Sequence, residues 1–488
     1  MGQWIQLCRW GIFLGIAISL VASARPYDRL AVQKSFIQLP SPQISPRLPQ
    51  KLTLKEAILL ALRTNPNVES DELQRVLDKF SLDAAHAAFA PQYNLAGAYN
   101  MQSGGSPTYD VNPTVTMATP IGTTITMGYD NTLTGGGGVA SVGITQPLLQ
   151  GAGKVAAIPL ENALDSEEVN KLNFKNNIIT VVVNVVNAYR TLLKDYSNLT
   201  IQKNALEQDR ETLRQYELQL KYGKIARSEL IQQQATLTQD ELSYKQTQQG
   251  IYTDYQAFLT ALGLRADINI EIDQTIPVDT QYKVPDLQES IEKALSGNIA
   301  YQSAVIQLRA TERGLISAKD QQKWTLGLSA SRSGGSNTGA GATTDTDTTI
   351  NGSTTVGLAL AIPINNISNQ QAVATAEIAL EQARISLAEQ RRALVATVTQ
   401  QINTLQNQLE QIDIAKKNVD FQQQTYQSTI IKQKYGKATV FELSQQKNSL
   451  VSAQISLIGA RIDLLNDITA FNQTLGTVLD NWDIKLRY

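Results

Sequence analysis

The chain has 488 residues with 42 basic and 44 acidic side chains, and no basic run or stripe marks a nucleic-acid-binding surface. Only 42% of the residues are hydrophobic, which is little for compact soluble domains of this total size. A single cysteine, Cys8, excludes an internal disulfide, and a single histidine, His86, leaves little material for zinc or triad chemistry. Because His86 stands between alanines, we expect it to be a packing or surface residue.

Residues 1–24 are predicted to be an export signal. Arg9 supplies a positive charge, the apolar run at 11–22 is too short to span a bilayer, and ASA at 22–24 fits a cleavage site. A retained membrane anchor is the alternative. Cys8 precedes the apolar run and is lost on cleavage, so we expect no lipid anchor. The rest of the chain has no apolar segment long enough for a transmembrane helix.

The next segment, residues 25–50, contains the proline-rich sequence LPSPQISPRLP at 39–49. We interpret it as an extended linker outside the fold, because closely spaced prolines favour extended backbone.

Five later segments alternate in hydrophobicity with a period of two, as strands do. They are 93–101, about 121–131 and 139–147 in the first half of the chain and 325–333 and 354–362 in the second. Each is about as long as a tilted strand that crosses a bilayer. The region between 93–101 and 139–147 is longer than its counterpart in the second half, with room for an extra hairpin at 111–131. Gly-rich runs at 134–138 and 333–353 are expected to be exposed loops. Two soluble hairpins of a small sheet are the alternative.

Residues 160–220 are predicted to form one long helix. Val182, Val185 and Tyr189 begin a seam with alternating steps of three and four, which is typical of left-handed supercoiled helices. Such a helix is roughly 90 Å long. The sequence KYGK at 221–224 interrupts it, and its glycine frees the backbone to turn. We therefore expect the tip of an antiparallel helix hairpin here; a glycine tolerated within a continuous helix is the alternative.

The same pattern recurs 213 residues later, where KYGK stands at 434–437. The apolar positions Leu230, Leu237, Tyr244, Ile251 and Phe258 correspond to Leu443, Leu450, Leu457, Leu464 and Phe471. Finding the turn twice at one heptad phase favours two hairpin tips. One apolar residue per heptad suits a wall whose other face borders water.

Two strands per repeat give four per chain, too few to close a barrel, and open sheet edges are not tolerated in lipid. Three chains would supply twelve strands, so a barrel shared by three protomers is the natural solution.

Several fragments, in their order and duplication, resemble the TolC-type outer-membrane efflux proteins, or outer membrane factors. The resemblance covers nearly the whole chain after the signal. The fragments are LTLKEAILLALRTNPNV (52–68) with a weaker copy at 284–301, APQYNLAGAYN (90–100), VGITQPLLQG (142–151), VGLALAIPI (356–364), YGKIARSEL (222–230) and YGKATVFEL (435–443).

This resemblance implies an α+β membrane protein that is a homotrimer. Long coiled-coil helix hairpins form a periplasmic tunnel, and four strands per chain contribute to a 12-stranded barrel in the lipid of the outer membrane of a Gram-negative-type cell. The hairpin tips dock a periplasmic adaptor (membrane fusion) protein and, through it, an inner-membrane ABC or RND transporter. The duct serves efflux of small molecules or type I secretion of proteins. We expect no enzyme activity, no cofactor and no nucleic-acid partner.

The resemblance places the adaptor-docking surface at the two tips, Tyr222, Gly223, Lys224, Tyr435, Gly436 and Lys437. These lysines either contact an adaptor or keep the tips soluble.

Rings of charged side chains give such pores their selectivity. Glu229 and Glu442 stand six residues past the tip glycines, and three-fold symmetry would turn each into a ring of carboxylates. Gln445 stands where the family often has a second acid, which makes the pore-mouth constriction less negative. Our hypothesis is a link between Arg227 and Glu442 across the hairpins. The alternative is that both acids lie on a solvated helix face. The helix dipole also favours an acidic side chain in the first turn of a helix.

The expected organisation is signal peptide (1–24), linker (25–50), first repeat (51–263, strands within 93–147), inter-repeat linker (264–284), second repeat (285–476, strands within 325–362) and C-terminal tail (477–488). Two rival functions remain open: a trimeric structural tether that conducts nothing, and an exported enzyme with paired carboxylates.

Overall fold

The computed structural model describes residues 37–38, 51–101, 103, 107–132, 137–276, 282–336, 350–364 and 366–488. The predicted export signal, most of the proline-rich linker and most of the predicted loops at 134–138 and 333–353 lie outside the described residues.

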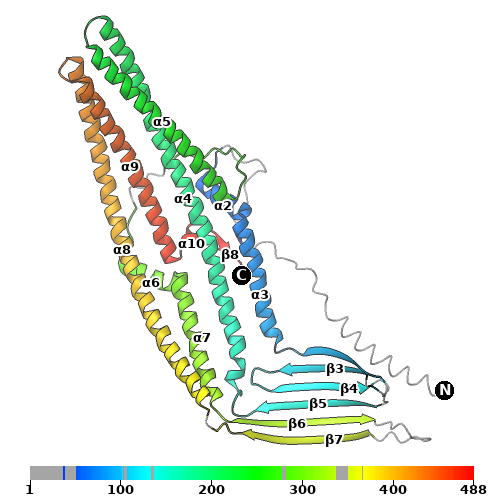
Figure 1. The fold of residues 1–488 in the computed structure, drawn as a ribbon. Helices are drawn as coiled ribbons and strands as arrows, with labels where there is room; N and C mark the ends of the chain where they lie inside the picture. The colour runs from blue at the N-terminus through cyan, green and yellow to red at the C-terminus, as the bar shows by residue number, and fades with distance from the viewer. Residues whose placement is uncertain are drawn as a thin grey trace.

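Two long helix hairpins run side by side to two tips at one end of the molecule, and a sheet lies at the other end (Figure 1). The helices are α2 (Leu54–Thr64), α3 (Pro66–Ala87), α4 (Lys154–Lys221), α5 (Arg227–Leu262), α6 (Leu287–Gly297), α7 (Ile299–Gln321), α8 (Ile367–Lys434), α9 (Val440–Leu475) and α10 (Val478–Asn481). The strands are β1 (Ile37–Gln38), β2 (Gln92–Asn100), β3 (Thr108–Ala118), β4 (Thr124–Thr132), β5 (Gly137–Pro147), β6 (Thr325–Ser336), β7 (Ile350–Ala361) and β8 (Lys485–Leu486).

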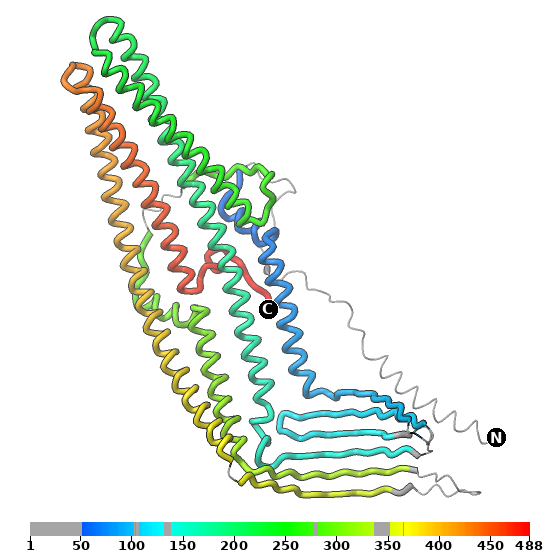
Figure 2. The backbone as a smooth tube through the Cα atoms, viewed as in Figure 1, coloured from blue at the N-terminus to red at the C-terminus, as the bar shows by residue number. Residues whose placement is uncertain are grey.

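The internal duplication predicted from the sequence is confirmed in the helices. Helices α4 and α8 each have 68 residues, and α5 and α9 each have 36. Their boundaries keep the offset of 213 throughout, so the two hairpins are equal in length and their tips lie at the same end (Figure 2). Within the described part of the chain, none of the helices is both long and apolar enough to cross a membrane.

The main sheet is an antiparallel meander in the order β2-β3-β4-β5-β6-β7. The architecture expected from the sequence is confirmed, but the expected number of four strands is wrong. The segment 108–132 forms a full hairpin, β3–β4, which separates β2 from β5. Its own alternation of Thr114, Val115, Thr116 and Met117 has the period of a strand, so it pairs along the sheet.

Each repeat has its own apolar core where a short helix meets the long pair. In the first, α2 packs on α4 and α5 around Ile58, Val185 and Leu259. In the second, Ala294 of α6 packs among Leu405, Leu464 and other side chains of α8 and α9.

The described parts of the two predicted linkers contribute to the fold. The segment after α5 adds Ile270 and Ile272 to the first core, and its backbone pairs with Leu52, whose N–H donates to the carbonyl of Glu271 at 2.7 Å. In the N-terminal linker, β1 pairs with β8 of the C-terminal tail. The expectation that the N-terminal linker lies outside the fold is therefore wrong for Ile37–Gln38, whose backbone finds hydrogen-bond partners in β8.

A repeated glycine joins each hairpin to its short-helix corner. Gly263 and Gly476 end α5 and α9 in the left-handed conformation, with φ of 72° and 75°. A Cβ on Gly476 would lie 2.1 Å from the carbonyl oxygen of Gly297, and one on Gly263 would lie 2.5 Å from that of Thr64. At both places, two segments of the backbone approach each other so closely that only glycine fits.

This close approach predicts unequal effects for two glycine substitutions. Gly476→Ala adds a backbone clash to the ~1–2 kcal/mol that a left-handed Ala costs, so we expect a large fall in thermal stability. Gly436→Ala, at φ 70° with nothing within 4 Å of the new Cβ, should cost only the conformational part. Thermal unfolding of both variants in detergent measures the difference; equal melting temperatures would contradict the packing argument.

Candidate functional site at the hairpin tips

The two tips have the same backbone geometry. At the first, the N–H of Lys224 donates to the carbonyl of Gln219 at 2.9 Å and that of Gly223 to Leu220 at 2.9 Å. At the second, Lys437 donates to Lys432 at 2.9 Å, and the glycine at the same place is Gly436. This pattern is a Schellman motif, which needs a left-handed residue after the helix and explains both glycines.

The predicted adaptor-docking residues lie together at the exposed end of each hairpin. Tyr222 and Tyr435 are each 73% exposed, an unusual state for an aromatic side chain. Lys224 and Lys437 are exposed beside them. Each tip therefore exposes one tyrosine and one lysine at the same end of the molecule.

The predicted constriction residues lie just below the tips, but they do not all meet. Glu442 closes a capping box at the start of α9: its Oε2 accepts the Thr439 N–H at 2.9 Å, and the Glu442 N–H donates back to Thr439 Oγ1 at 3.2 Å. Arg227 is exposed at the start of α5, and among the described residues it forms no salt bridge with Glu442. Glu229 is half-buried and Gln445 is exposed. The capping box holds the Glu442 carboxylate near its own helix terminus.

A buried ionic cluster joins the two hairpins beneath these residues. The Nζ of Lys447 on α9 donates to carboxylates of both Asp209 on α4 and Asp240 on α5. Lys447 is 3% exposed and Asp209 4%. We call these three side chains the inter-hairpin cluster. Because Lys447 and Asp209 are almost fully buried, loss of the Lys447 cation leaves a buried carboxylate without its partner.

Hydrogen bonds between uncharged side chains also join the two hairpins at about the level of this cluster. Gln433 Nε2 on α8 donates to the Tyr216 hydroxyl on α4 at 3.1 Å, and the Thr236 and Ser444 hydroxyls of α5 and α9 lie 3.5 Å apart. Burial raises the pKa of Tyr216 to about 12, so its hydroxyl stays protonated.

The charge state of the cluster depends on pH. Burial, and next a hydrogen bond with Asp240, raises the pKa of Asp209 to about 6, against the opposing attraction of Lys447. Two carboxylates around one ammonium leave one negative charge in excess, so a proton is taken up easily.

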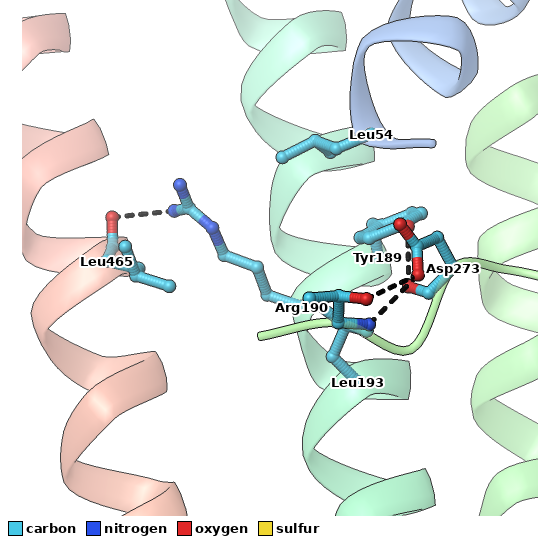
Figure 3. A pocket seen from close by; sticks show the side chains of 7 residues that line it. Leu54, Tyr189, Arg190, Leu193, Asp273 and Leu465 are labelled. Carbon is cyan, nitrogen blue, oxygen red and sulfur yellow. Dashed lines mark hydrogen bonds between the residues drawn. The ribbon is translucent and has the colours of Figure 1, made fainter. Parts of the chain in front are cut away.

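A second layer joins the hairpins nearer their base. Arg190 of α4 reaches across to α9, where its Nη1 donates to the Leu465 carbonyl at 2.6 Å and to Thr469 Oγ1 at 2.7 Å (Figure 3). The Tyr189 hydroxyl lies 2.8 Å from the carbonyl oxygen of Asp273. Leu54, Leu193 and Leu465 line the small pocket around these groups. Since Arg190 bonds mainly uncharged oxygens, this layer fastens the two repeats without an ion pair.

Sequence reasoning missed the inter-hairpin cluster, although a signal was present. Asp209 lies between Leu206 and Tyr216 on the apolar seam of α4, where a charge is out of place. Lys447 stands between Leu443 and Leu450 on the seam of α9. Only the tertiary structure shows that these seam charges meet.

The described residues contain no group of three or more His, Cys, Asp or Glu side chains that could hold a metal ion.

Both the sequence and the fold are similar to known proteins. The sequence matches the outer membrane efflux protein family over residues 57–264 and 290–477. The fold is similar to VceC of Vibrio cholerae (14% identity, 87% of this chain and 96% of that one, TM-score 0.65). It is also similar to the open state of the MtrE channel of Neisseria gonorrhoeae (14%, 91% and 97%, TM-score 0.65) and to the CmeC channel of Campylobacter jejuni (13%, 90% and 94%, TM-score 0.64). A comparison with curated protein sequences gave no match.

The inter-hairpin cluster predicts a pH dependence of stability. Because the pKa of Asp209 in the fold, about 6, lies above the ordinary 3.8, the folded chain binds this proton more tightly than the unfolded chain. The stability of the native chain relative to Asp209→Asn should therefore rise as pH falls from about 6 to about 4. Melting temperatures of both proteins across this range measure it.

Asp413 on α8 is the matched control, since a hydrogen bond from Lys417 lowers the pKa of its exposed carboxyl. The native chain relative to Asp413→Asn should lose stability as pH falls through the lowered pKa. A difference of the same sign for both variants would contradict our assignment.

Proposed function

The chain belongs to the outer membrane efflux protein family, and on that premise we propose that it is the outer-membrane channel of a tripartite efflux or type I secretion system. It passively conducts small molecules or secreted proteins from an inner-membrane transporter and its adaptor to the exterior. The protein lies in the outer membrane, and its relatives are channels rather than enzymes.

The observation that carries the proposal is that the main sheet has two unpaired edge strands. The outer strands β2 and β7 each pair with one neighbour only in the described chain. A membrane sheet cannot leave these edges bare, because unpaired backbone groups in lipid cost several kcal/mol each. Pairing of β7 with β2 of the next copy closes a ring, and three copies make the homotrimer in which the helix hairpins surround the duct.

The tips support the proposed partners. Tyr222 and Tyr435, with Lys224 and Lys437, are exposed at the end farthest from the sheet. Aromatic side chains of this kind are typical interface anchors. We assign them to docking of a periplasmic adaptor protein, through which an ABC or RND transporter delivers cargo.

The inter-hairpin cluster supports a resting duct that is narrowed at the tips. It holds α9 against α4 and α5 near the tips, while the Arg190 layer fastens α4 to α9 nearer the base. Breaking the first while keeping the second lets the tips separate about a fixed base. In this proposal Glu229, Glu442 and Gln445 line the mouth as three-fold rings, with Arg227 beside them.

The first test is the mass of the detergent-purified protein together with its conductance in a planar bilayer. We expect a trimer that produces discrete conductance steps. A trimer that inserts but never conducts, even after the cluster is broken, supports the structural tether instead. A protein that does not insert contradicts the membrane channel outright.

A second test replaces the cation of the cluster. Lys447→Met leaves the buried Asp209 and the partly buried Asp240 without their cation, and loss of one partner of a buried ion pair costs about 3–5 kcal/mol, so we expect a lower melting temperature and a larger mean conductance. Lys417→Met is the control, because Lys417 pairs with Asp413 on an exposed face of α8 at 2.7 Å and such pairs contribute little. Equal conductance of the two variants would rule out the cluster as a closing link.

A further inference from the structure

Within the described part of the main sheet, the β3–β4 hairpin has no counterpart in the second repeat. Helices α4 and α8 are related by an offset of 213, whereas β2 and β6 begin 233 positions apart. The first repeat therefore carries additional chain between its first strand and its long helix, and this chain forms β3 and β4. In the second repeat, β6 pairs directly with β7.

The hairpin is continuous with the sheet. β2 pairs with β3 from Gln92↔Thr116 to Asn100↔Thr108, and β4 pairs with β5 from Thr124↔Thr145 to Thr132↔Gly137. A plug folded into the duct would leave β2 paired with β5. The order of strands excludes that arrangement in the described sheet, because β3 and β4 stand between them.

The hairpin also shares both faces of the sheet. Cross-strand partners point to one face. One row of partners across five strands is apolar: Met117, Ile125, Ile144, Ala330 and Val356. The adjacent row crosses all six strands and is polar or small: Gln92, Thr116, Thr126, Gly143, Ser331 and Thr355. The hairpin thus presents lipid-type side chains on one face and channel-type side chains on the other.

Aromatic residues extend the pattern. Tyr99 and Tyr109, opposite each other on β2 and β3, have ring centroids 5.0 Å apart, and both are exposed. They lie at the sheet end away from the helices, and on the face of the apolar row. Tyrosines at this level are typical of the aromatic girdle at a membrane interface.

The turn of the hairpin is fastened to the helical part. The Gly153 N–H, just before α4, donates to the Ile121 carbonyl at 3.1 Å. The Thr123 hydroxyl donates to the side chain of Gln146 on β5. Gly122 has φ 91°, and a Cβ there would lie 2.6 Å from the Gly151 carbonyl oxygen. The hairpin is therefore held at one end in line with the other strands.

We propose that the β3–β4 hairpin is a permanent part of the barrel wall, so that three chains close an 18-stranded barrel whose outer face contacts membrane lipid, instead of a 12-stranded one. This rests on the proposed trimeric channel. Since barrel diameter grows roughly linearly with strand number, the exit is about 1.5 times as wide as a 12-stranded one. The outer opening then admits bulkier cargo, and the tips remain the narrowest part of the duct.

Spin labels test the position of the hairpin. Cys8 is the chain's only cysteine, so single cysteines can be introduced in a Cys8→Ser background and labelled in liposomes. We expect labels at Val115 and Met127 to be relaxed by lipid-soluble oxygen, and labels at Thr114 and Thr126 by a water-soluble nickel chelate. Val142 and Ser141 on β5, whose place in the wall does not depend on the hairpin, are the matched controls.

The outcomes separate the two proposals. If the controls alternate but all four hairpin labels respond to the nickel chelate, the hairpin lies in water and the wider barrel is wrong while the channel stands. If the controls also fail to alternate, the sheet does not face lipid and the proposed channel fails.

The width is measured by the largest neutral polyethylene glycol that enters from the outer side and lowers conductance. A variant lacking residues 108–132 joins residue 107 to residue 133 and should bring β2 beside β5, in the way that β6 lies beside β7 in the second repeat. We expect the limiting polymer radius of the full chain to exceed that of the variant by about 1.5-fold, following the change in strand number. Equal radii would overturn the proposal. If the variant does not assemble, the spin-label pattern decides alone.

Discussion

The structure depends on the equal length of two helix hairpins. Because α4 matches α8 and α5 matches α9 residue for residue, positions related by the duplication lie at the same height. The two tips then lie at the same end of the molecule (Figure 1), and a lysine on one hairpin can meet two aspartates on the other. A change in length of one helix would shift every contact above it by about 1.5 Å per residue, and the inter-hairpin cluster would lose its partners.

Two layers divide the work of joining the hairpins. The base is fastened by Arg190 through hydrogen bonds to oxygens that carry no charge, and by the first apolar core, in which Ile462 of α9 lies among side chains of α4. The layer near the tips consists of one cation between two carboxylates. Breaking a buried ion pair costs free energy, but protonation of a carboxylate or an ion pair with another partner can offset that cost. In the proposed channel, this arrangement would let the duct open at the hairpin tips while the Arg190 contacts hold the opposite ends of the hairpins together.

The sheet adds a different kind of asymmetry. Helices obey the duplication closely, whereas the first repeat contains two more strands than the second. The inserted hairpin keeps the alternation and the cross-strand rows of its neighbours. A wall built of hydrogen-bonded strands accepts a complete hairpin at little cost, because every new backbone group is paired and the apolar face stays continuous. A helix inserted into the supercoiled part would instead disturb the seam.

The sequence by itself determined the long helices, the two turns and the duplicated order, because heptad spacing and a repeated glycine are local signals that each repeat confirms in the other. It also indicated the strands, and its alternation within 111–131 allows an extra hairpin but does not show whether that hairpin joins the sheet. The tertiary structure alone decided that this hairpin joins the sheet, since the same alternation is compatible with a hairpin that folds away and leaves β2 paired with β5. It alone decided that Lys447 meets Asp209 and Asp240, because a charge on a seam does not show which charge on another helix it will find. Glu442 illustrates the same limit. The sequence places it just after the second turn, but its capping box with Thr439 depends on where α9 begins.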